Sequence, residues 1–284
     1  MPDILPIAAA DGHRFEAALY RAASKHAPLL IFFPALGTPH HVYRHIAAAL
    51  TRLGIHVAVP DWRGIGSSSI RAARRSDFGY RDMVEIDAPA AIAALQAHLP
   101  EAALWVGGHS MGGQLCGLIA TQTPATQGML LISSGSVLAR GYSPPIRYGI
   151  YAVRAVAWLS APWLGYFPGS RVGFGGREAN GVMRDWLHVA RTGDYRPRGS
   201  NIDYEKLLPR LHFPVLALNF AADRWAPHAA AQNLLAKFSN CRREHWLWQA
   251  TDCNGLDFDH FTWTKQPDIV APRVAQWLLS HCAA

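Results

Sequence analysis

The segment 104–113 constrains the fold of this 284-residue chain more than any other. An apolar run, 102–106, leads into the pentapeptide Gly-His-Ser-Met-Gly at 108–112, and a second apolar run follows at 114–120. A G-x-S-x-G pattern between a strand and a helix predicts a sharp turn that lifts the serine hydroxyl, here that of Ser110, above the sheet. The residues two positions to either side are expected to be glycine because side chains there would clash in so tight a turn.

A serine placed in this way predicts nucleophilic catalysis, which requires two further groups. The hydroxyl needs a base to take its proton, and the base needs an acid that orients it. We looked for both in the loops that follow strands, since these loops meet at one edge of a parallel sheet. Asp223 follows the expected strand 214–220, and His260 lies between the last expected strand and the closing helix. The sequence therefore predicts Ser110 as nucleophile, His260 as base and Asp223 as acid.

Other roles are open for several of these residues. Asp223 could instead cap the helix that follows it. Three aspartates share the loop of His260 and are rivals for the acid, although immediate neighbours rarely present a carboxylate to Nδ1: Asp252, Asp257 and Asp259. His109, beside the nucleophile, is expected to have a packing or supporting role.

The rest of the chain alternates between strand and helix patterns. A hairpin is expected at 3–24, turning at Asp11-Gly12, and the buried strands are expected at 29–33, 56–60, 102–106, 128–133, 214–220 and 244–249. Helices are expected at 38–53, capped by Thr38, at 82–98 with a kink at Pro89, and at 114–120, 227–238 and 269–279. This rhythm predicts an α/β fold with a mostly parallel central sheet flanked by helices.

The rhythm stops between residues 136 and 211. We expect residues 1–135 and 212–284 to form the core and residues 136–211 to form an inserted, mainly helical cap. The inserted segment is rich in aromatic residues. These could line a pocket for an apolar acyl or aryl group, or they could form the core of the cap itself.

The composition argues against several classes of binding partner. The formal charge is +7, but no stripe of Lys and Arg interleaved with aromatics is present, which argues against nucleic-acid binding. The four cysteines have no metal or disulfide spacing, no secretory leader is recognisable, and no run is long enough for stable membrane insertion, so we expect a cytoplasmic protein. His40, His41 and His45 lack an H-E-x-x-H pattern and are expected at a solvated helix start rather than at a metal.

Together these motifs resemble the α/β-hydrolase superfamily over nearly the whole chain. The resemblance rests on Gly-His-Ser-Met-Gly-Gly at 108–113, Asp-Trp-Arg-Gly-Ile-Gly-Ser at 61–67, Asp223 and the late His260. Within the superfamily the chain looks most like poorly characterised members near the serine aminopeptidase and monoacylglycerol-lipase-like branches. The local similarities to that group are Pro-Ala-Leu-Gly at 34–37, Gly-Tyr-Phe-Pro-Gly at 165–169, Trp-Ala-Pro at 225–227 and Asp-His-Phe at 259–261.

The resemblance implies an acyl-enzyme on Ser110 that water then hydrolyses, with a small-molecule ester or acyl substrate and no metal or organic cofactor. It also implies an oxyanion hole made by the backbone N–H groups of Met111 and Leu36, with Gly37 as the alternative to Leu36. The His-Gly often found in that loop is replaced by Pro34 and Ala35, which leaves the backbone donor available. The oligomeric state is not indicated.

Four other functions fit the same residues. An acyltransferase or an amidase would use the same catalytic groups. An aminopeptidase would also need an acidic residue of the cap to bind the substrate amine, with these candidates: Glu178, Asp185, Asp194, Asp203 and Glu205. A non-catalytic binding protein is possible because fold does not determine function. Dehalogenases and epoxide hydrolases of similar fold place Asp, not Ser, at the turn.

Overall fold

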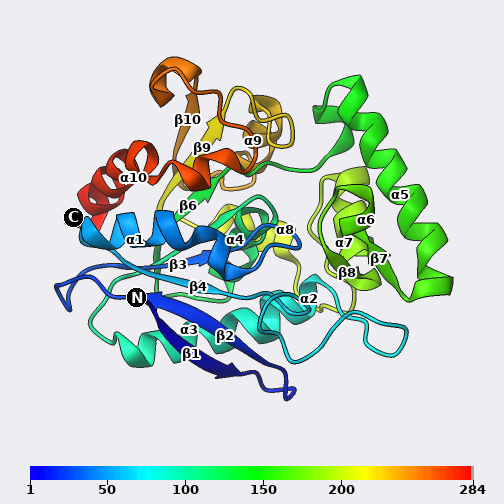
Figure 1. The fold of residues 1–284 in the computed structure, drawn as a ribbon, viewed down its shortest axis with the longest axis horizontal. Coiled ribbons are helices and arrows are strands. Elements are labelled where there is room, and N and C mark those ends of the chain that lie inside the picture. Colours follow the sequence, from blue (N-terminus) through cyan, green and yellow to red (C-terminus); the bar gives the residue numbers. More distant parts are fainter. Residues whose placement is uncertain (283–284) are drawn as a thin grey trace.

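A sheet of eight strands organises the molecule, in the order β1-β2-β4-β3-β5-β6-β9-β10 (Figure 1). The computed structural model describes residues 1–282. Strands β4 to β10 in this order are parallel, and the β1–β2 hairpin adds to β4 in the antiparallel sense. The strands span Asp3–Ala8 (β1), Arg14–Tyr20 (β2), Leu29–Phe33 (β3), His56–Pro60 (β4), Leu104–His109 (β5), Thr126–Ile132 (β6), Pro214–Phe220 (β9) and Arg242–Trp248 (β10).

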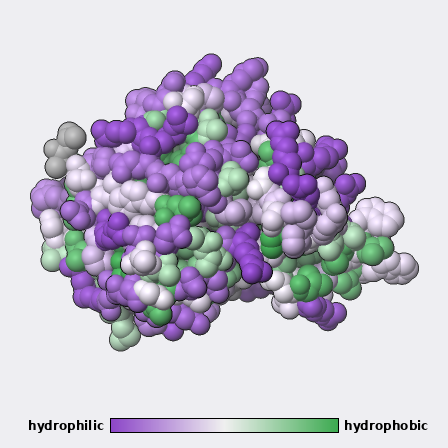
Figure 2. All heavy atoms as spheres, turned by 90° about the horizontal axis from the view of Figure 1, so that it is seen from above, coloured by the Kyte–Doolittle hydropathy of each residue, from purple (hydrophilic) through white to green (hydrophobic). Residues whose placement is uncertain are grey.

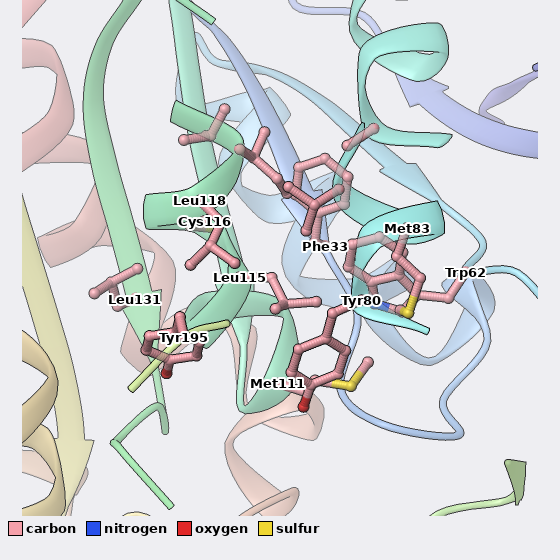
Figure 3. Packing of buried hydrophobic residues seen from close by; sticks show 14 of the residues in the cluster. Phe33, Trp62, Tyr80, Met83, Met111, Leu115, Cys116, Leu118, Leu131 and Tyr195 are labelled. Carbon is pink, nitrogen blue, oxygen red and sulfur yellow. The ribbon is translucent and has the colours of Figure 1, made fainter. Parts of the chain in front are cut away.

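Helices cover both faces of this sheet, which explains why the central strand β3 is apolar and buried at every position. In β3, Leu29 and Ile31 pack into the core cluster on one face, and Leu30 and Phe32 pack into the cluster on the other. The first face is covered by α3 (Ala88–His98), α4 (Met111–Thr121) and α9 (His228–Leu235), and the second by α1 (Arg44–Arg52) and α10 (Pro267–Cys282). Figure 3 shows part of the first cluster, with Leu115 of α4 near Phe33 and Leu131. The predicted mostly parallel α/β architecture is confirmed.

The helix after β3 begins differently from the prediction. A short 3-10 helix, η1 (His40–Tyr43), precedes α1, and Thr38 does not cap it. The Thr38 hydroxyl donates to the Leu36 carbonyl instead, and the N–H of His40 donates to Asp61 Oδ1 at 2.7 Å. A carboxylate distant in sequence therefore satisfies the helix start.

Pro89 is accommodated without breaking its helix. A short helix, α2 (Tyr80–Asp82), continues into the π-helical turn η2 (Met83–Asp87) and then into α3, of which Pro89 is the second residue. The first turn of a helix tolerates proline because its N–H groups have no intrahelical acceptor, and the wider turn before it absorbs the change of register. The helix therefore starts two residues before the predicted Asp82.

The segment between β6 and β9 leaves the sheet and packs beside it, at the right of Figure 1. We call residues 136–211 the insert. It contains η3 (Ala139–Gly141), α5 (Pro144–Leu164), β7 (Tyr166–Pro168), α6 (Gly169–Val172), β8 (Arg177–Ala179), α7 (Asn180–Thr192), α8 (Tyr204–Leu207) and η4 (Leu208–Arg210). Strands β7 and β8 form an antiparallel pair. The short helices η5 (Ala250–Cys253) and η6 (Thr262–Lys265) follow β10. Within residues 1–282, no helix combines the length and the apolar character that crossing a membrane requires.

Candidate active site

Ser110 occupies the turn between β5 and α4 in a conformation that side chains rarely adopt. Its φ is 53° and its ψ is −118°. A Cβ on Gly112 would lie 2.0 Å from the Phe33 carbonyl oxygen, and one on Gly108 would lie 2.4 Å from the Gly112 carbonyl carbon. Both glycines are therefore required by the close approach of backbone to backbone, as the pattern 108–112 predicts.

The structure brings the three predicted catalytic side chains into one hydrogen-bonded chain. Ser110 Oγ and His260 Nε2 are 2.9 Å apart, and His260 Nδ1 and Asp223 Oδ2 are also 2.9 Å apart. The Asp223 side chain is fully buried and His260 is 13% exposed. An imidazole held in this way can accept the serine proton at Nε2 while the carboxylate stabilises the resulting cation.

Backbone donors hold the second oxygen of Asp223. Oδ1 accepts the N–H groups of Trp225 at 2.9 Å and Ala226 at 3.2 Å. Helix α9 begins only at His228, with Pro227 at its N-cap position, so Asp223 does not cap it. The carboxylate is thus oriented by the loop that carries it.

The rival aspartates point elsewhere. Asp252 accepts the N–H of Gln249 and lies 3.6 Å from Arg273. Asp259 lines the cleft, but its Oδ1 accepts the N–H groups of Phe261 and Thr262, at 2.8 Å each. Its carboxylate therefore stabilises its own loop. In residues 1–282, Asp257 makes no hydrogen bond or ion pair. Of the four aspartates considered from the sequence, Asp223 is the one bonded to His260.

The two predicted oxyanion donors flank Ser110 at the cleft. Met111 is the first residue of α4, so its N–H has no acceptor within the helix. The N–H of Leu36 donates to no group in the part of the chain described here. The loop of Leu36 is held by Trp62 Nε1, which donates to the Pro34 carbonyl at 2.8 Å, and by the Ala35 N–H, which donates to a tyrosine.

That tyrosine, Tyr43, connects the Leu36 loop to His109, whose ring lies beside His260. Its hydroxyl accepts the Ala35 N–H at 2.9 Å and lies 2.9 Å from His109 Nδ1, to which it can donate. The His109 ring lies 4.7 Å from the His260 ring. Burial, together with the adjacent His260, lowers the pKa of His109 well below its usual range, so this imidazole stays neutral. Besides packing, as expected, His109 makes a hydrogen bond to Tyr43. Sequence reasoning missed Tyr43.

The three histidines around the start of α1 differ from the prediction of a uniformly solvated group. His41 and His45 are exposed, but His40 Nδ1 lies 2.9 Å from the buried Asp61 Oδ2. This hydrogen bond raises the pKa of His40. Asp61 also accepts the N–H and hydroxyl of Ser67, so the loop at 61–67 is tied to the start of α1. Across residues 1–282, no cluster of three or more His, Cys, Asp or Glu side chains could hold a metal ion.

A cleft of about 500 Å³ opens above Ser110. This volume is in the range of small-molecule sites. The insert contributes five of the apolar side chains that line the cleft: Val137, Tyr142, Ile150, Phe174 and Trp186. The Phe174 ring lies 5.1 Å from that of Trp186 and 5.3 Å from that of Trp225, which forms an aromatic wall.

Most aromatic residues of the insert fall into three groups, while Tyr166 is half-buried under the Arg177 guanidinium. Tyr142, Phe174 and Trp186 line the cleft, while a second group is fully buried in the core: Phe167, Tyr195 and Tyr204. A third group faces solvent, which neither alternative from the sequence foresaw: Tyr148, Tyr151, Trp158 and Trp163.

Gln114 is a further cleft residue that sequence reasoning missed. It lies one turn after Ser110 on α4, is 5% exposed, and its buried Oε1 has no partner in residues 1–282. Residues four apart on a helix share a face, so the position of Ser110 contained the signal that could have found it.

Comparison with known proteins agrees with this architecture. A family model described as alpha/beta hydrolase fold matches residues 28–145. No curated protein matches the chain. Among solved structures, a thermophilic esterase from Thermogutta terrifontis is similar, with 19% identity, a TM-score of 0.63, and coverage of 98% of this chain and 99% of the esterase.

Two other solved structures show how varied proteins of this shape are. Est1E from Butyrivibrio proteoclasticus, with ferulic acid bound, has 16% identity, a TM-score of 0.64, and coverage of 99% of this chain and 100% of Est1E. A haloalkane dehalogenase variant from Bradyrhizobium elkanii has 14% identity, a TM-score of 0.66, and coverage of 100% of this chain and 98% of the dehalogenase. At these identities the likeness establishes the fold alone. With its mostly parallel sheet flanked by helices, the chain has the α/β-hydrolase fold, and the family model of that fold matches residues 28–145.

Proposed function

We propose that this chain is a serine hydrolase that cleaves a carboxylic ester or thioester through an acyl-enzyme on Ser110. The observation that carries the proposal is the hydrogen-bonded chain from Ser110 through His260 to Asp223 at the floor of the cleft. An isolated surface serine would need neither a strained backbone nor a buried carboxylate behind its histidine.

The reaction proceeds in two halves. His260 Nε2 takes the proton of Ser110 Oγ as this oxygen attacks the substrate carbonyl, and the negative charge that develops on the carbonyl oxygen is met by the N–H groups of Met111 and Leu36. Collapse of this intermediate breaks the bond to the alcohol or thiol, which leaves with the proton from His260. Water then attacks the acyl-enzyme with His260 again as base, which releases the acid and restores Ser110.

The lining of the cleft favours an apolar acyl or aryl group. Tyr142, Ile150, Phe174 and Trp186 present apolar surface opposite the nucleophile. An aminopeptidase is less well supported, since none of the five acidic candidates in the insert lines the cleft within residues 1–282. The Est1E structure, which holds ferulic acid, shows that a protein of this fold can bind an aromatic acid.

A fluorophosphonate probe tests the proposal directly. We expect it to label the wild type and to leave Ser110→Ala unlabelled. Esters of p-nitrophenol with graded acyl chains would then report the preferred chain length. Failure to label the folded wild type, or equal labelling of the alanine variant, would overturn the proposal.

A further inference from the structure

Helix α5 of the insert has an apolar outer face whose large side chains are exposed in the described part of the chain, residues 1–282. Its inner face is buried against the insert through Ile150, Val153 and Ala157. The large side chains of the outer face are strongly exposed: Tyr148 by 68%, Tyr151 by 50%, Trp158 by 77%, Leu159 by 59% and Trp163 by 77%. Proteins rarely expose so many large apolar side chains on one helix face. Where a large apolar patch does occur on a surface, it commonly marks a binding site.

The position of α5 makes this face available. The helix runs along the outer edge of the molecule, away from the central sheet (Figure 1). In Figure 2, green and white residues gather at the right-hand edge, where the insert lies, while purple residues predominate over much of the remaining view. Leu164, the last residue of α5, and Val172 of α6 extend the exposed apolar surface.

The segment that carries this face is basic. No Asp or Glu occurs between residues 102 and 177, and the part of this stretch that belongs to the insert carries five arginines: Arg140, Arg147, Arg154, Arg171 and Arg177. Arg154 and Arg171 are exposed, and neither makes an ion pair or side-chain hydrogen bond within residues 1–282. Such a surface is complementary to a partner that offers both apolar and anionic groups.

We propose that the outer face of α5 docks on an anionic lipid surface. Tryptophan and tyrosine are favoured at the level of lipid headgroups, and an amphipathic helix with arginines at its flanks can lie in the plane of the interface. The phosphate groups of the headgroups would then meet the unpaired arginines. The helix lies on the membrane and does not span it.

A second copy of this chain fits the face less well. In a symmetric dimer through α5, the same patch would face itself. Arg154 and Arg171 would then approach the equivalent arginines of the second copy. Residues 102–177, which include α5 and α6, contain no carboxylate that could neutralise them. An anionic bilayer satisfies both the apolar and the charged part of the surface.

The docking face also adjoins the candidate active site. Ile150 on the inner side of α5 lines the cleft of Ser110 and a second depression of about 560 Å³. This depression carries Arg154 of α5 together with Arg184 and Arg191 of α7. Docking through α5 would therefore place an arginine-lined depression and the neighbouring cleft beside the lipid surface.

Vesicle binding tests the apolar part of the proposal. The full-length protein is expected to co-sediment with vesicles of equimolar phosphatidylcholine and phosphatidylglycerol. Replacing both Trp158 and Trp163 by alanine should weaken this partitioning at least about tenfold, since each removes a large apolar side chain from the interface. The matched control replaces Leu53 and Leu256, which are also exposed but lie outside the insert, by alanine, and should bind like the wild type.

The charged part is tested by neutralising arginines. Arg154→Gln and Arg171→Gln should each weaken binding about fivefold at low salt, and binding to pure phosphatidylcholine should be much weaker throughout. Arg14→Gln and Arg242→Gln, exposed arginines outside the insert that likewise make no ion pair within residues 1–282, are the matched controls.

Three results would overturn the proposal. One is equal binding of the wild type and the double tryptophan variant. Another is binding that is equally strong to vesicles with and without phosphatidylglycerol. The third is a dimer in solution that the tryptophan substitutions dissociate, without any vesicle binding, since a second copy would then cover α5.

One arm of the test rests on the proposed esterase activity. The double tryptophan variant should lose turnover of an ester embedded in anionic vesicles while it keeps turnover of a soluble p-nitrophenyl ester. Loss of both activities in a folded variant would contradict a docking role confined to α5. Inactivity of the wild type on every ester would count against the proposed function alone, because vesicle binding is measured without catalysis.

Discussion

Replacing Ser110 by glycine is expected to leave the protein more stable than replacing it by alanine. With φ at 53° and ψ at −118°, any side chain at this position is strained. A residue held in such a sparsely populated region costs about 1–3 kcal/mol. Glycine avoids this cost but loses about 0.5–1 kcal/mol more conformational freedom on folding. Both variants lose the hydroxyl and its hydrogen bond to His260, so the difference isolates the backbone and should be about 0.5–2 kcal/mol in favour of glycine.

Urea unfolding followed by tryptophan fluorescence measures this difference. At equal m-values, the midpoint for Ser110→Gly should lie above that for Ser110→Ala. Ala48→Gly in α1 is the control, since a glycine in an ordinary helix should lower stability by about 1 kcal/mol. If glycine at position 110 were no more stable than alanine, the turn would store no strain, and the explanation of the pattern 108–112 would be wrong.

Three further expectations concern other parts of the molecule. Asp223→Asn should lower turnover by about 10⁴-fold, with the protein still folded, because His260 would lose the carboxylate that orients it; near-normal rates would move the acid to another residue. Burial raises the pKa of Glu178 from 4.5 to about 7. As the pH rises, the unfolded state releases this proton before the folded state does, so the free energy of unfolding falls. Measured by urea unfolding, the wild type should lose up to about 3 kcal/mol of stability between about pH 5 and about pH 8, relative to Glu178→Gln. Parallel pH profiles of the two proteins would contradict this. Gly112→Ala should prevent soluble expression, because its Cβ would lie 2.0 Å from the Phe33 carbonyl oxygen, while Gly149→Ala, with nothing within 4 Å, should be tolerated; equal expression of the two would refute the steric reasoning.

The positions of the aromatic side chains of the insert could not be predicted from the sequence, unlike the strands of the sheet. Its aromatic content is obvious from the composition, but three destinations of these side chains emerge only in three dimensions. Trp186 faces the cleft, Tyr204 is buried, and Trp158 faces solvent. Helix periodicity tells which residues share a face, but it does not tell which face the rest of the molecule covers.

Local patterns by themselves determined the sheet and the turn that carries Ser110. Strand β9 has the predicted limits of Pro214 and Phe220, because the mostly apolar run that begins at Pro214 and ends before Asp223 is a signal contained within a few residues. The glycines of the turn are equally local, since the clash that excludes a side chain at Gly108 involves the backbone of Gly112 in the same turn.

Tertiary structure alone decided which distant groups meet. The sequence offered four aspartates for His260, and the path of the loop after β9 brings Asp223 within 2.9 Å of its ring. Asp61, rather than Thr38, satisfies the start of η1 because β4 ends beside it. These contacts join residues far apart in the chain, and their partners are selected by the packing of whole elements, which no pattern of neighbouring residues contains.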